Sequence, residues 1–226
     1  MNKVIIRLAD ILFALAFISL VSPLWVFVVI TLLFTGEGKV IYKQLRVGKQ
    51  GKSFELLKFA TMRSDSPNIG TGELTTYNDP RVLPFGKFLR KTKINETPQF
   101  VNVLLGQMSI VGPRPQTPFY LSVFTEEVQE KVKEVKPGIT GVGSIIFRDE
   151  EELIKDIKDP KVFDIDVIVP YKGLLELWYV NNKSLKTYIL IIFLTAYSVL
   201  FPKNQLYTLL LKDLPCLPAE LARLMV

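Results

Sequence analysis

The 226-residue chain has no histidine and a single cysteine, Cys216. Without imidazole it cannot build a Ser-His-Asp triad, a Cys-His nucleophile pair or a zinc site with histidine ligands. One cysteine cannot form an intramolecular disulfide, which fits a reducing compartment. Acid–base or nucleophilic chemistry must therefore come from carboxylates, lysines, tyrosines or a bound metal ion.

Long apolar runs are confined to residues 8–34 and 187–201. The first run is interrupted only by Asp10 and a few small polar residues. It is longer than the core of a typical secretory signal, and no small-residue cleavage motif follows it. Its length suffices to cross the hydrocarbon core of a bilayer, so residues 1–36 are predicted to be a membrane segment.

Pro23 lies close to the middle of this run and follows Ser22. Proline lacks an amide donor and its ring clashes with the carbonyl of Ser19, four residues earlier, so a kink is predicted. The Ser22 hydroxyl is well placed to bond a carbonyl that the break releases. Kinks also occur in ordinary spanning helices, so the segment is either a straight span or a re-entrant helix–break–helix.

Basic residues flank the run on both sides and favour the re-entrant form. A spanning helix would leave one group outside the cytoplasm, whereas a segment that enters and returns keeps both groups inside. Asp10 is expected to pair with Arg7 or to reach headgroup water, unless it is simply a solvated residue at a helix end. The flanking cations are Lys3 and Arg7 before the run and Lys39, Lys43, Arg46, Lys49 and Lys52 after it.

Short alternating segments at 39–46 and 53–59, separated by a glycine-containing turn, predict a β-hairpin. Gly51-Lys52-Ser53 suggests a phosphate loop, but Arg46 stands where that motif needs glycine, so only the turn is predicted. The remaining pattern predicts a polar loop at 64–78, helices at 86–93, 98–105 and 125–135, and a strand at 163–170. A second apolar helix at 185–201 is short for a span and has Lys183, Lys186 and Lys203 beside it, so it is expected to lie along the membrane interface.

These patterns predict an α/β protein of the α+β type, mostly helical, with interfacial amphipathic helices. Its expected parts are the re-entrant segment 1–36, a catalytic domain 37–180, and an interfacial helix and tail 181–226. The net charge of +6 fits either nucleic acid or anionic lipid and phosphorylated substrates. No platform of clustered aromatic and basic residues is apparent, so no nucleic-acid partner is expected.

Two polar segments are candidates for function. Asn95-Glu96-Thr97-Pro98 reads as a helix start, with Asn95 as a possible cap and Glu96 favourably placed near a helix amino terminus. Further on, Pro113 and Pro115 bracket Arg114 and fix the backbone on both sides of it. This mount suits bidentate recognition of phosphate or carboxylate by the guanidinium, although a stiff turn with a solvated arginine gives the same pattern.

Taken together, the motifs resemble the bacterial sugar transferase family, the monotopic polyprenol phosphate phosphoglycosyl transferases. The similarity runs from about Arg7 to Phe201, and the order and spacing of its pieces are specific. The matching segments are Ser22-Pro23, 42–48, Lys58-Phe59-Ala60-Thr61-Met62, Asp79-Pro80-Arg81, 86–90, 96–99, Gly112-Pro113-Arg114-Pro115 and Pro137-Gly138-Ile139-Thr140-Gly141.

The resemblance implies a small domain partly sunk in the cytoplasmic face of the bacterial inner membrane, with Mg²⁺ as cofactor. In such enzymes an aspartate of an Asp-Glu pair attacks the β-phosphate of a UDP-sugar and releases UMP, and the phosphosugar then passes to polyprenol phosphate. Carried over, the likeness implies Asn95 and Glu96 as catalytic and metal-binding residues. It implies substrate binding by Lys58, Arg90, Pro113, Arg114 and Pro115.

Three positions depart from the family pattern. Asn95 stands where aspartate is usual, Gln107 replaces another aspartate, and Ala60 replaces an arginine. An amide is a poor nucleophile and a weaker Mg²⁺ ligand than a carboxylate. The chain is thus a subgroup member in which Glu96 is the working carboxylate, an inactivated form suited to trapping substrate, or a catalytically silent membrane-bound nucleotide-sugar binding protein. The intact neighbouring motifs favour the first.

Overall fold

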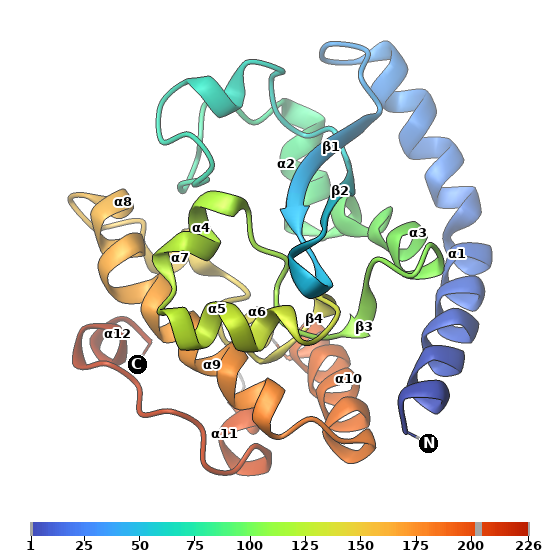
Figure 1. The fold of residues 1–226 in the computed structure, drawn as a ribbon. Helices are drawn as coiled ribbons and strands as arrows, with labels where there is room; N and C mark the ends of the chain where they lie inside the picture. Colours follow the sequence, from blue (N-terminus) through green and yellow to red (C-terminus); the bar gives the residue numbers. More distant parts are fainter. Residues whose placement is uncertain (1, 202–204, 226) are drawn as a thin grey trace.

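The computed structural model describes residues 2–201 and 205–225, so Lys203 lies outside the described residues. The fold is mostly helical, with one long apolar amino-terminal helix along its side (Figure 1). Its helices are α1 (Asn2–Phe34), α2 (Pro84–Lys91), α3 (Gln99–Leu104), α4 (Pro118–Val123), α5 (Glu126–Lys133), α6 (Val142–Ile146), α7 (Glu150–Leu153), α8 (Pro160–Phe163), α9 (Val169–Asn181), α10 (Leu185–Leu200), α11 (Leu206–Leu210) and α12 (Ala219–Leu224). The predicted helices at 86–93, 98–105, 125–135 and 185–201 are confirmed within a few residues at each end.

Two small sheets accompany the helices. The predicted hairpin is confirmed as β1 (Ile41–Val47) and β2 (Ser53–Phe59), antiparallel, with a 3₁₀ turn η1 (Lys49–Gly51) between them. A second sheet, which the sequence did not predict, pairs β3 (Ser109–Val111) in parallel with β4 (Gly138–Thr140). A three-residue strand is too short to produce a readable alternation, so this pairing is invisible in sequence.

Helix α1 is long and apolar enough to cross a membrane, judged by length and composition, and little of it is buried. Both of its halves nevertheless pack on the same globular body. Near its start, Arg7 donates to the carbonyls of Val103 and Leu104, and beyond Pro23 the indole of Trp25 donates to Thr97 Oγ1 at 2.9 Å. The helix therefore lies along the body from end to end (Figure 1).

The amide that Pro23 removes is replaced locally. Ser22 Oγ donates to the carbonyl of Ser19 at 2.9 Å, which is the bond predicted from the sequence. The helix continues through Pro23 as one element, so the structure does not show the predicted break into two helices. Because a side chain satisfies the released carbonyl, proline is tolerated within an apolar helix.

The expectation for Asp10 was wrong. This carboxylate is buried and does not pair with Arg7 or face solvent. It accepts hydrogen bonds from the Ser109 hydroxyl, the Ile110 amide and the Tyr188 hydroxyl, the last at 2.7 Å. A single acid thus joins α1, β3 and α10, three elements that are distant in sequence.

The predicted strand at 163–170 was also wrong. This segment is helical throughout, with a π-helical turn η4 (Asp164–Ile168) between α8 and α9. Its β-branched residues favour strands locally, but Asp164 and Ile168 are four residues apart and both are buried on one face. Packing in the main core therefore overrides local propensity, as it often does for β-branched segments.

The polar loop at 64–78 is irregular as predicted, apart from a 3₁₀ turn η2 (Ser66–Asn68). It is held in shape by Arg81, which is buried and pairs with Asp79 at 2.6 Å. The guanidinium also donates to the loop carbonyls of Ser66, Ile69, Gly72 and Leu74. All three guanidinium nitrogens of Arg81 donate hydrogen bonds, so a residue just after the loop holds its backbone in place.

Candidate functional site

Glu96 lies at the centre of a cluster of cations. It ends a 3₁₀ turn η3 (Ile94–Glu96) that follows Lys93, whose φ of 58° turns the chain sharply after α2. Its Oε1 is 3.9 Å from Lys58 Nζ on β2 and 3.9 Å from Arg114 Nη2 in the loop after β3. Three segments that are distant in the sequence therefore converge on one carboxylate.

The Arg114 loop is fixed by a close backbone approach. A Cβ on Gly112 would lie 2.5 Å from the Lys136 carbonyl, and one on Gly138 would lie 2.1 Å from the Gly112 amide nitrogen. Only glycine fits at these two positions, so the loop seats directly on β4. The carbonyl of Pro113 accepts a hydrogen bond from the Gly138 amide at 2.8 Å, which anchors the residue before Arg114.

Two further residues, Glu176 and Arg46, hold this loop through hydrogen bonds to its backbone. Glu176, buried on α9, accepts the Arg114 amide hydrogen bond through Oε1 at 3.2 Å. Arg46, on β1, donates from Nη1 to the carbonyl of Pro115 at 2.9 Å. Burial, and then the charge of Arg114, lowers the pKa of Arg46 to about 10. The backbone that carries Arg114 is thus held by hydrogen bonds at Arg114 and at Pro115.

The electrostatic balance at Glu96 is strongly positive. Burial acts to raise the pKa of Glu96, but the charges of Lys58, Arg114, Lys93 and Arg90 outweigh it and lower the pKa to about 2. Burial lowers the pKa of Lys58 to about 7, against the opposing effect of Glu96. One ionised carboxylate faces several cations, so the group keeps an excess of positive charge that can bind a polyanion.

An open pocket surrounds this group. Glu96 is the one carboxylate among the described residues that line it. Pro115 and the buried Gln99 also contribute to the wall. The lining residues are Arg46, Leu56, Lys58, Glu96, Gln99, Arg114, Pro115, Gly138 and Ile139.

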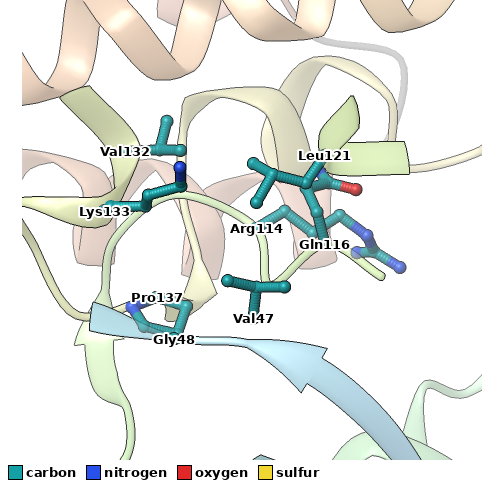
Figure 2. Close-up of a pocket in the computed structure, with 8 residues that line it drawn as sticks. All are labelled: Val47, Gly48, Arg114, Gln116, Leu121, Val132, Lys133 and Pro137. Atoms are coloured by element: carbon teal, nitrogen blue, oxygen red, sulfur yellow. The ribbon is translucent and has the colours of Figure 1, made fainter. Parts of the chain in front are cut away.

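A second hollow lies beside Arg114 and has different chemistry. Figure 2 shows its lining, in which the guanidinium of Arg114 points away from Lys133 and Pro137. The lining is largely apolar, with Val47, Leu121 and Val132, and none of the described residues in it carries a carboxylate. The acid and the cations therefore meet in the pocket of Glu96.

Two residues expected at the site, Arg90 and Asn95, are not among the residues that line the pocket of Glu96. Arg90 pairs with Glu151 at 2.5 Å, and only its charge is felt at Glu96. Asn95 does not cap a helix as suggested, because it lies inside η3 and its side chain makes no capping bond. Its Oδ1 is buried and has no hydrogen-bond partner among the described residues.

Donors for a divalent cation are few. Of the described residues, no three acidic or cysteine side chains gather closely enough to hold a metal alone. The available oxygens are the Glu96 carboxylate and the unpartnered Asn95 Oδ1. This set fits Mg²⁺, which commonly takes one or two protein oxygens and completes its shell with water and substrate phosphates.

Sequence reasoning placed no function on Arg46, Gln99 or Glu176. Arg46 and Gln99 lie within segments that match the family pattern, so the resemblance could have indicated both as site residues. Glu176 is embedded in an apolar helix that the sequence had partly read as strand. A charged residue in such a helix is the only local sign of a buried acid.

Comparison with known proteins agrees with the geometry. A family model described as bacterial sugar transferase matches residues 1–202. The UDP-glucose:undecaprenyl-phosphate glucose-1-phosphate transferase of Klebsiella pneumoniae is 34% identical over 206 residues, which are 90% of this chain and 42% of that protein. A UDP-N-acetylgalactosamine-undecaprenyl-phosphate N-acetylgalactosaminephosphotransferase of Aeromonas hydrophila is 33% identical over 193 residues, 84% of this chain and 42% of the relative.

An exopolysaccharide production protein of Rhizobium leguminosarum bv. phaseoli is 31% identical over 207 residues, 88% of this chain and 97% of its own length. The chain thus spans about two fifths of the Klebsiella and Aeromonas proteins and nearly all of the Rhizobium protein. With a family model matching residues 1–202, the chain belongs to the bacterial sugar transferase family.

Proposed function

We propose that this chain transfers a sugar phosphate from a UDP-sugar to a polyprenol phosphate, initiating glycoconjugate synthesis at the cytoplasmic face of the bacterial inner membrane. The observation that carries the proposal is Glu96 held 3.9 Å from both Lys58 and Arg114. The names of the relatives support it, since the Klebsiella and Aeromonas proteins are named as transferases of this type.

The proposed chemistry begins with Glu96 as nucleophile. An oxygen of its carboxylate attacks the β-phosphorus of the UDP-sugar, the bond from that phosphorus to the bridging oxygen breaks, and UMP leaves with that oxygen. A phosphate oxygen of the polyprenol phosphate then attacks the same phosphorus and restores the carboxylate. Lys58 and Arg114 offset the charge of the diphosphate, and the lowered pKa of Glu96 keeps it ionised.

Magnesium is part of the proposal. Glu96 and Asn95 would hold Mg²⁺ together with the substrate phosphates, and the ion would supply charge neutralisation at those phosphates. The residue at position 95 contributes a neutral oxygen where the family pattern has a carboxylate. The protein ligands would therefore bring one negative charge fewer to the metal ion than the family pattern does.

The membrane placement is proposed on packing and charge. Both halves of α1 contact the same body, which suits a helix that enters and leaves the bilayer on one side. Trp25 bonds Thr97, the residue after Glu96, so the proposed nucleophile is adjacent to the membrane helix. A lipid-borne phosphate acceptor would approach from this side.

Replacing Glu96 with glutamine tests the proposal. The substitution keeps the shape and removes the nucleophile, so UMP release from UDP-glucose or UDP-N-acetylgalactosamine, with Mg²⁺ and undecaprenyl phosphate, should fall at least about a hundredfold. Glu130→Gln, on the exposed face of α5, is the matched control and should retain activity. Equal activity in both variants would remove Glu96 from the chemistry.

A second function is favoured by one observation, the amide at position 95. A silent protein would bind UDP-sugar without releasing UMP, because Asn95 replaces the usual nucleophile. Calorimetry with the unmodified chain would then show binding while the UMP assay stays at background. On that reading Asn95→Asp should create UMP release, whereas measurable turnover by the unmodified chain excludes a silent binder.

A further inference from the structure

Five cations gather at the start of α1, away from the pocket of Glu96. Lys3 and Arg7 lie on the first two turns of α1, and Lys183 lies just before α10. The bond between Asp10 and Tyr188 fixes the beginnings of these two helices side by side, as Figure 1 also shows. Lys136 precedes Pro137, whose carbonyl accepts from the Ser109 amide next to Asp10.

Two of the five cations, Arg7 and Lys136, converge at Gly106. Arg7 Nη2 and Lys136 Nζ lie 3.4 Å and 3.6 Å from the point where a Cβ on this glycine would stand. Two positive groups therefore face the same small residue. Lys49, in the hairpin turn η1, completes the cluster, because η1 packs against α5 just before Lys136.

The cluster has no counter-ion of its own. Among residues 2–201 and 205–225, none of the five lies within 4.0 Å of a carboxylate. Asp10 is the nearest acid in the same network, and its oxygens are already bonded to Ser109, Ile110 and Tyr188. Arg7 is held by the carbonyls of Val103 and Leu104, which carry no net charge. Unpaired like charges repel, so an external anion would stabilise the arrangement.

The titration of two lysines is consistent with this crowding. Burial, and then the charge of Arg7, lowers the pKa of Lys136, with Lys49 and Lys183 acting in the same direction and Asp10 opposing them. Burial, and then Lys49 and Lys3, lowers the pKa of Lys183, again against Asp10. A bound anion would act in the opposite direction to these causes, raising the pKa of both lysines.

The neighbouring surface indicates the source of the anion. Val4, Leu8 and Leu12 on the same end of α1 are more than half exposed, as is Ile189 on α10. A soluble phosphate needs no apolar neighbours, whereas a phospholipid places its phosphate directly beside acyl chains. Cations at the edge of a bare apolar surface match the headgroup level of a bilayer.

We propose that Lys3, Arg7, Lys49, Lys136 and Lys183 bind the phosphate of an anionic phospholipid headgroup beside the start of α1. The site rests on the membrane placement proposed above, and it is separate from the transfer reaction because none of the five lines the pocket of Glu96. Its role is to hold one end of α1 at headgroup depth. The pocket of Glu96 is thereby kept at a constant height relative to the lipid.

The test compares partitioning of the detergent-purified full chain into vesicles of phosphatidylcholine with and without phosphatidylglycerol. The unmodified chain should prefer the anionic vesicles, and the double variant Lys136→Gln/Lys183→Gln should lose roughly thirtyfold in that preference. Lys131→Gln/Lys133→Gln removes the same charge from α5, where both ammonium groups already pair with glutamates, and should keep it. Lys49→Gln/Lys183→Gln, at two exposed positions, serves if the first variant fails to fold.

Several results would overturn the site. Equal losses in the cluster and α5 variants would reduce the effect to net charge, and no loss in either would exclude the cluster. Stabilisation of the detergent-solubilised chain by inorganic phosphate, without any vesicle preference, would replace the lipid with a free anion. The partitioning assay contains no UDP-sugar, so its result does not depend on turnover. A lipid preference here, together with no UMP release in the separate assay with UDP-sugar, would sink the transfer reaction and leave the lipid site standing.

Discussion

At the scale of single residues, Glu176 is an acid whose ionisation opposes folding. It is fully buried, and its Oε2 has no hydrogen-bond partner among the described residues. Burial raises its pKa from 4.5 to about 7, although the Arg114 amide and the charges of Arg114 and Lys172 act the other way. The folded protein therefore holds a proton that the unfolded chain releases above pH 4.5.

This difference gives a pH prediction. The contribution of Glu176 to the free energy of unfolding should fall as pH rises from about 4.5 to about 7, by about 3 kcal/mol in total, and then level off. Glu176→Gln is neutral at every pH and still offers an oxygen to the Arg114 amide, so it should unfold at a higher temperature than the unmodified chain at pH 8.

Thermal unfolding in detergent, measured across this pH range, checks the prediction. The two proteins should have similar midpoints near pH 4.5 and separate as pH rises. Glu130→Gln, at an exposed ion pair on α5, should show no such separation. A Glu176→Gln variant that is less stable at pH 8 would mean that the ionised carboxylate is a favourable partner in the folded state.

Residue identity predicted the members of the candidate site better than their local roles. Glu96, Lys58 and Arg114 were expected from the family likeness, and the structure brings all three together. Asp10 and Asn95 were given local roles that the structure does not support, a pairing with Arg7 and a helix cap. Local pattern cannot reveal burial that depends on partners 99 and 178 positions away, as it does for Asp10.

At the scale of elements, strong periodicity was readable and weak periodicity was not. The hairpin and the helices that were predicted correctly carry alternation or 3.6-residue spacing over seven or more residues, or a proline at the start. Residues 163–170 carry β-branched side chains without a second strand to pair with, and core packing makes them helical. The parallel β3–β4 pair depends on Gly112 fitting against Gly138, a contact between distant segments.

Helix α1 gives the prediction that belongs to this scale. If it enters and leaves the bilayer on one side, cysteines at its two ends should share a compartment. In a Cys216→Ser background, Lys3→Cys and Lys39→Cys should both react with an impermeant thiol reagent in inside-out vesicles and neither in intact cells. Labelling of one position from each side would establish a straight span.

At the scale of the whole molecule, α1 is both the proposed membrane anchor and part of the core. Ala14, Val28 and Leu32 are buried against the body, and Phe17 stacks on Phe100 with ring centroids 3.9 Å apart. The opposite face is bare, with Leu20 the most exposed leucine of the helix. One helix thus presents one side to the protein and the other to the proposed lipid.

Removing the helix and altering its outer face should therefore have different effects. A chain lacking residues 2–34 should aggregate or unfold without a cooperative transition, because it uncovers core surface on α3 and β2. Leu12→Gln/Leu20→Gln should weaken vesicle partitioning while keeping a cooperative transition in calorimetry. A well-folded soluble protein from the truncation would contradict the structural role of α1.

The bond between Asp10 and Tyr188 has a consequence for biosynthesis. The acid is made within the first ten residues, whereas the Tyr188 hydroxyl that donates a hydrogen bond to it is made 178 residues later. Until then, a nascent α1 carries an unpaired carboxylate that resists entry into hydrocarbon. The start of α1 can therefore reach its final packing only after α10 has been synthesised, so the first helix made is among the last to be completed.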